Sequence, residues 1–208
     1  MRGLFGATLN NYYLLKNHRA FLIYLLVVPA LIAAYVILQV PRLLDILQVL
    51  LVLGIPAGIL EAATGSFQSR WNIFENSWGS SPFVMVVSRY IVFLAASIIF
   101  IGIWLLLPME SNRVTEGIFH GVSLYDMIIW SQIYCILFFP LLYMLNPRKT
   151  DVAVFVIIVT LVAAIALGVG LTRFVNDMWH IAGIIAASYV VSVMLSSVFN
   201  SFHRGKTS

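Results

Sequence analysis

Six apolar runs, separated by short polar stretches, constrain the fold of this chain more than any other feature. Each run holds roughly 18–22 residues, the length at which an α-helix crosses the ~30 Å hydrocarbon core of a membrane. Only 10% of the residues are charged and 62% are hydrophobic, too little charge to cover a water-soluble domain. We therefore predict an all-α, polytopic membrane protein with six transmembrane helices. They run over about Ala20–Val40, Leu43–Ala63, Tyr90–Leu107, Met127–Leu145, Val152–Thr172 and Met178–Phe199.

The lysines and arginines indicate which ends of these spans face the cytoplasm. If the N-terminus lies inside, nine of the twelve basic residues fall in inner segments. These nine are Arg2, Lys16, Arg19, Arg70, Arg89, Arg148, Lys149, Arg204 and Lys206. Because basic residues concentrate on the cytoplasmic side of membrane proteins, both termini are predicted to be cytoplasmic. The basic residues are scattered at the ends of apolar runs rather than clustered, so they do not indicate a nucleic-acid partner.

We interpret residues 1–208 as one transmembrane domain in five parts. Residues 1–19 form a cytoplasmic or interfacial N-terminus, where Phe5, Leu9 and Tyr13 would share one face of a short helix. The first two spans follow in residues 20–63, and the last four occupy residues 90–199. Between them lies a cytoplasmic connection of residues 64–89, and residues 200–208 are a cytoplasmic tail. A frayed basic segment remains the alternative for the N-terminus.

The 64–89 connection carries a distinct amphipathic pattern. Trp71, Phe74 and Trp78 fall at i, i+3 and i+7, so a short helix would carry all three aromatic side chains on one face. Such a helix is suited to lying along a membrane surface or to docking on a protein partner. Both alternatives are open on this pattern.

Several functional classes lack support in the sequence. Glu61, Asp126 and His180 lie near span ends, whereas ion-driven transporters usually carry ionisable groups at mid-depth. No His-Glu-x-x-His zinc motif and no Gly-x-Ser-x-Gly turn occurs. The terminal Gly205-Lys206-Thr207 lacks the upstream glycine of a phosphate-binding loop. We therefore expect no metal site, no cofactor bound by this chain and no enzymatic activity of its own.

Small residues at helical spacing indicate close helix packing. Gly54 and Gly58 are four residues apart on the second span, and Gly183 and Ala187 repeat that spacing on the sixth. Small side chains let membrane helices approach closely. Other small residues in the last two spans are Gly168, Gly170, Ser188, Ser192 and Ser196. The two pairs have two possible roles. They predict either close packing between helices of this chain, or a small-residue face that lines a contact with a second chain or a substrate path.

The motifs of the 64–89 connection also match a known pattern. Ser69-Arg70-Trp71 and Phe74 match its first part, Ser81 its middle part, and the run Met85–Tyr90 its last part. On these residues the chain resembles small ABC-2-type transporter permeases, the group that includes phenol-soluble-modulin and bacteriocin exporters. It departs from that pattern at Trp78-Gly79, where the family has Leu-Pro, and at Pro82, where the family has arginine.

This resemblance implies one half of a transport path, completed by a second permease chain in a bacterial plasma membrane. Two separate ATPase subunits would bind ATP and Mg²⁺, and a hydrophobic or amphipathic cargo, such as a peptide, lipid or drug, would cross among helices bathed in membrane lipid. The residues implied in contact with the ATPase are Arg70, Trp71, Phe74, Glu75, Trp78 and Arg89. A non-transport scaffold or peptide-immunity protein is the main alternative, and an intramembrane enzyme is a third.

Overall fold

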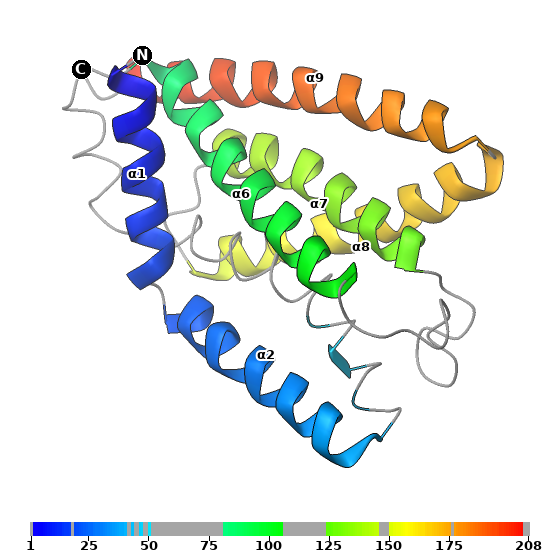
Figure 1. Cartoon of the computed structure of the whole chain (residues 1–208). Coiled ribbons are helices and arrows are strands. Elements are labelled where there is room, and N and C mark those ends of the chain that lie inside the picture. The colour runs from blue at the N-terminus through cyan, green and yellow to red at the C-terminus, as the bar shows by residue number, and fades with distance from the viewer. Residues whose placement is uncertain are drawn as a thin grey trace.

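Every secondary-structure element in the part of the chain that the structure describes is a helix (Figure 1). This computed structural model describes residues 2–17, 19–40, 43, 46–47, 50, 81–105, 124–145, 150–175 and 177–205. The helices are α1 (Arg2–Asn17), α2 (Arg19–Leu38), α6 (Pro82–Leu105), α7 (Leu124–Leu145), α8 (Thr150–Phe174) and α9 (Met178–Gly205). The predicted all-α fold is confirmed for these residues.

Four of the helices are long and apolar enough to cross a membrane. Their spans are Pro82–Ile99, Ile128–Leu145, Asp151–Phe174 and Met178–Phe202. A shorter apolar stretch, Leu26–Leu38, lies in α2, within the predicted first span. The predicted second span, Leu43–Ala63, falls almost entirely outside the described residues. The protein is therefore a multi-pass membrane protein, while the count of six spans and their orientation stay predictions.

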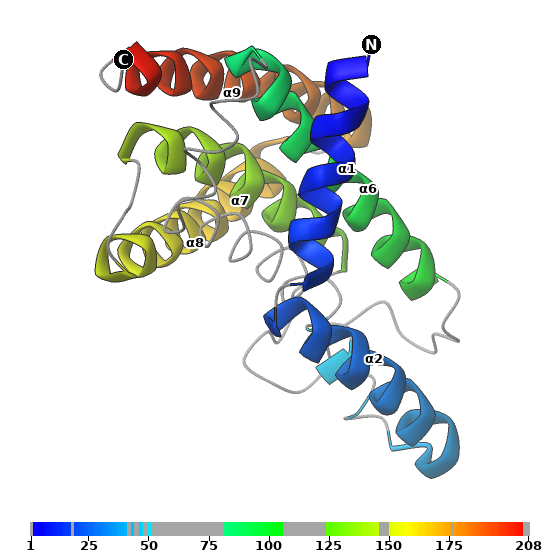
Figure 2. The same cartoon turned by 90° about the vertical axis from the view of Figure 1, so that its left-hand side faces the viewer.

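The N-terminal segment forms a helix, as the spacing of its apolar residues predicts. Figures 1 and 2 show α1 crossing α6 at the end of the bundle where α6 begins. Phe5 is 73% exposed and Leu9 is also exposed, so both point away from the contact with α6. The side chain of Tyr13 lies outside the described residues. This exposed apolar edge fits a helix at the membrane surface, which remains our interpretation of α1.

The start of α6 corrects a predicted boundary. The sequence predicts the third span from Tyr90, whereas α6 begins at Pro82 and so contains the last residues of the 64–89 connection. Ser81 caps the helix, because its Oγ accepts a hydrogen bond from the Val84 backbone N–H at 3.2 Å. Proline follows at the first helical position, where its missing N–H costs nothing. Together, the Ser81 cap and Pro82 place the start of the helix earlier in the sequence than hydropathy alone does.

Helix α7 lies at the centre of the packing, with extensive contacts to both α8 and α9. Its Phe139 ring packs against Tyr90 and Phe93 of α6, with ring centroids 4.5 and 6.4 Å apart. Phe138 and Phe139 also contact each other and are fully buried. These aromatic contacts join α6 to α7 around the buried Phe139 ring.

Helix α9 extends beyond its predicted end at Phe199, continuing to Gly205. Asn200, in this added turn, is buried and donates a hydrogen bond from Nδ2 to the Pro82 carbonyl oxygen at 3.4 Å. Ser201 donates to the Ser197 carbonyl oxygen within the same helix. The first residues of the predicted 200–208 tail are therefore part of the helical bundle.

Candidate functional site

Three consecutive residues of α6, Ser88, Arg89 and Tyr90, each contact a different helix. Successive residues in an α-helix are turned by about 100°, so three in a row face three directions. All three side chains are buried, and Arg89 is only 6% exposed. We call this cluster the 88–90 junction. Its first two residues are the last two of the predicted 64–89 connection, and all three lie two turns into α6.

Ser88 links α6 to α1. Asn11 of α1 donates a hydrogen bond from Nδ2 to the Ser88 Oγ at 2.7 Å. The Ser88 hydroxyl in turn donates to the Met85 carbonyl oxygen at 2.7 Å. Since the hydroxyl has one proton, this second bond leaves its lone pairs free to accept from Asn11. The N-terminal helix is thus held by a defined polar contact as well as by packing.

Arg89 links α6 to α7. Its guanidinium carbon lies 5.4 Å from the centroid of the Tyr143 ring, within the range of a cation–π contact. A buried arginine is costly in a membrane protein unless its surroundings favour the cation. The aromatic face of Tyr143 is one such partner, and it fixes the guanidinium at the α6–α7 contact.

Tyr90 links α6 to α9 through a chain of hydroxyl groups. Its hydroxyl lies 2.5 Å from Ser192 Oγ and 3.2 Å from Ser196 Oγ. Ser192 donates its proton to the Ile136 carbonyl oxygen of α7 at 2.6 Å, so it accepts from Tyr90. Ser196 then donates to Tyr90. The hydrogen bonds thus run from Ser196 of α9 to Tyr90 of α6, then to Ser192 of α9. From Ser192 they reach the Ile136 carbonyl oxygen of α7.

A second contact between α7 and α9 lies nearby. Tyr189 of α9 donates to Gln132 Oε1 of α7 at 2.7 Å, and Gln132 Nε2 donates to Ser131 Oγ at 3.2 Å. The rings of Tyr189 and Tyr90 meet edge to face at 6.0 Å. Tyr189, Gln132 and Ser131 therefore pair with one another inside an apolar bundle, as low-dielectric surroundings favour.

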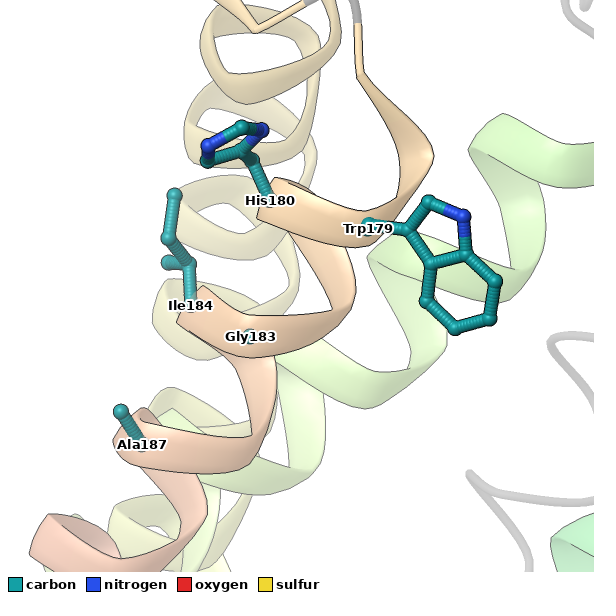
Figure 3. A pocket seen from close by; sticks show the side chains of 5 residues that line it. All are labelled: Trp179, His180, Gly183, Ile184 and Ala187. Carbon is teal, nitrogen blue, oxygen red and sulfur yellow. The ribbon is translucent and has the colours of Figure 1, made fainter.

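A shallow hollow marks the opposite end of α9 (Figure 3). Its volume is ≈ 450 Å³, and it is lined by Trp179, His180, Gly183, Ile184 and Ala187, all from α9. Trp179 is 84% exposed and points away from the helix. The hollow is mostly apolar and open, which suits contact with lipid or with another apolar surface rather than the enclosure of a soluble ligand.

Asp177 fixes the start of α9 beside this hollow. Its Oδ1 accepts from the Trp179 backbone N–H at 3.0 Å, and its Oδ2 lies 2.5 Å from His180 Nδ1.

Asp177→Ala removes this cap, and we expect it to lower the free energy of unfolding by about 1 kcal/mol. A detergent titration monitored by circular dichroism measures the change. Asp177→Asn is the control, because asparagine caps helices equally well; a loss as large as that of alanine would contradict the capping role.

The comparison with known proteins decides the family. A family model described as "ABC-2 family transporter protein" matches residues 8–202. The chain belongs to the ABC-2 transporter family. This family comprises the non-catalytic membrane subunits of ABC transporters, so the permease is not itself an enzyme. No curated protein and no solved structure matches the chain.

Most of the predicted ATPase contact lies outside the described residues of the permease. This holds for Arg70, Trp71, Phe74, Glu75 and Trp78. Arg89 is described, and the structure turns it toward Tyr143 inside the bundle rather than toward an open surface. The sequence alone does not indicate that Arg89 is buried, because a basic residue at the edge of an apolar run usually lies at the membrane interface.

Of the two predicted small-residue pairs, the structure also describes only one. Gly54 and Gly58 lie outside the described residues, whereas Gly183 and Ala187 are exposed on α9 and line the hollow. Added side-chain volume at Gly183 would meet no atom within 4 Å. Intrachain packing at Gly183 is therefore not observed within the described part of the permease, and a seam with a second chain stays a prediction.

Proposed function

We propose that this permease exports a hydrophobic or amphipathic cargo, such as a peptide, lipid or drug, driven by a separate ATPase subunit. Two permease chains would form the path, each with six spans and cytoplasmic termini. The motif between Ser69 and Tyr90 resembles that of the phenol-soluble-modulin and bacteriocin exporters, which supports an export role. The single observation that carries the proposal is the family match over residues 8–202.

The described helices support an apolar cargo. Helix α8 carries no Asp, Glu, Lys or Arg between Asp151 and Arg173, and α9 carries none between Met178 and Phe202. Much of the outer face of both helices is exposed and apolar, including Phe155 and Val190. A hydrophilic, charged cargo would need polar partners in the membrane. An apolar or amphipathic one needs none.

The 64–89 connection is the proposed contact with the ATPase. Trp71, Phe74 and Trp78 would enter the groove of that subunit, with Arg70 and Glu75 beside them. The connection runs into α6 through the capped start at Ser81, so a displacement of the docked residues is carried into a helix rather than lost in a loop. In this proposal Arg89 acts through its position two turns into α6, where it contacts Tyr143 of α7. ATP and Mg²⁺ remain on the partner.

Co-isolation tests the proposal. The tagged permease is purified from cells that express its neighbouring genes, and the co-isolated ATPase is quantified by mass spectrometry and ATP hydrolysis. Trp71→Ala with Phe74→Ala should reduce the ATPase yield about tenfold, equivalent to about 1.4 kcal/mol of binding free energy. Trp179→Ala, which removes an exposed tryptophan at the start of α9, is the matched control and should retain the partner.

Two results would contradict the proposal at different levels. If the double variant retains the ATPase fully, the aromatic residues do not dock it and membrane anchoring is favoured. If the unmodified permease isolates no ATPase at all, the export function is wrong, and a scaffold or immunity role becomes the better interpretation.

A further inference from the structure

The 88–90 junction lies two turns into α6, the helix into which the 64–89 connection runs. Residues before Ser81 lead directly into α6, whose first turn is fixed by the Ser81 cap. The Pro82 carbonyl oxygen is also bonded to Asn200 near the end of α9. Two turns further along, Ser88, Arg89 and Tyr90 contact α1, α7 and α9 in turn.

Tyr90 is the central member of this junction. Its hydroxyl accepts from Ser196 and donates to Ser192, while its ring packs on Phe139 of α7 and Tyr189 of α9. Ser192 remains bonded to the Ile136 carbonyl oxygen whether or not Tyr90 has a hydroxyl. Removing that hydroxyl therefore detaches α6 from α9 at one point and leaves the bond between α9 and α7 in place.

We propose that Tyr90 is a positioning residue that makes α6, α7 and α9 move as one body when the partner ATPase closes on the 64–89 connection. This inference rests on the proposed export function. Interhelical hydrogen bonds in membranes stabilise a fold only modestly, because the separated helices find other partners. A polar chain through three helices instead fixes their relative positions, so that a displacement of α6 carries the other two with it.

Distance measurement between spin labels tests this inference without knowledge of the cargo. Nitroxides are attached at Ile98→Cys on α6 and Val190→Cys on α9, two exposed positions. The chain's single native cysteine, Cys135, is buried and does not compete for the label. The distance is measured by pulsed electron resonance in the complex with the co-isolated ATPase, without nucleotide and after trapping with ATP and vanadate.

Two tyrosine variants are compared in this labelled background. Tyr90→Phe removes the hydroxyl of the junction. Tyr125→Phe is the matched control, because its buried hydroxyl has no hydrogen-bond partner among the residues that the structure describes, and it lies near the start of α7, far along the helix from Phe139. We expect the distance between α6 and α9 to stay constant on trapping in the unmodified chain and in the control. In Tyr90→Phe it should shift by roughly 2–5 Å, the scale of helix displacements in switching proteins, only in the trapped state.

Each other outcome overturns the inference. Identical trapped distances in Tyr90→Phe and Tyr125→Phe would show that the hydroxyl does not join the helices during the cycle. A shift already present without nucleotide would show a merely structural role. A shift on trapping in the unmodified chain would show that α6 and α9 do not move together. Failure to isolate any ATPase complex is distinct from these, because it removes the proposed export function and the inference with it.

Discussion

Replacing Phe139 with alanine is expected to lower the free energy of unfolding by about 2–4 kcal/mol. The ring is 1% exposed and packs against the rings of Tyr90, Phe93 and Phe138. In a soluble core the same change costs about 3–5 kcal/mol, which includes the transfer of the side chain from water. Lipid is as apolar as the protein interior, so here the cost comes from the cavity and the lost dispersion contacts, and it is smaller.

Titration of the purified permease with SDS in mixed micelles measures this effect. Phe155→Ala is the matched control, because Phe155 is 62% exposed on α8 and its truncation leaves no cavity; a change below about 0.5 kcal/mol is expected there. Equal losses for the two variants would contradict the position of Phe139 in the core. A loss confined to Phe139 would support the packing of α6 on α7 that holds the 88–90 junction.

Hydropathy and length predict much of this fold, because a membrane leaves few alternatives to long apolar helices. The helices α7 and α8 begin and end within a few residues of the predicted spans. The boundary at Tyr90 fails for a specific reason: Phe83, Val84 and Met85 are preceded by a polar stretch, and a hydropathy window averages the two. The Ser81-Pro82 pair carries the correct signal, and local capping rules identify it without any structure.

The candidate site is harder to predict, because it depends on which helices meet. The sequence indicates a polar stripe of Ser188, Ser192 and Ser196 on the sixth span, and two of these serines do bond to another helix. It gives no indication that their partner is Tyr90, since that pairing depends on how α6 packs on α9. Arg89 shows the same limit: hydropathy places it at an interface, whereas the extended start of α6 carries it into the bundle.

The second large effect is expected at Gly168 of α8, which lies directly against Trp130 of α7. A Cβ added there would overlap the indole of Trp130, which is itself buried in the core. Gly168→Ala therefore forces the indole or α8 to shift, and we expect it to cost about 1–3 kcal/mol of unfolding free energy. Gly170→Ala is the matched control, because a Cβ at Gly170 meets no atom within 4 Å.

The difference between Gly168→Ala and Gly170→Ala isolates the steric cost of the added methyl group. Alanine is the better helix former at both positions, so that contribution cancels in the difference between them. Trp130→Phe supplies a further test, because the smaller ring leaves room for the new methyl group. Gly168→Ala should then cost less in the Trp130→Phe background than alone, a coupling that SDS titration of the single and double variants measures. Additive losses, or equal losses for the two alanine variants, would show that α8 does not approach α7 through Gly168.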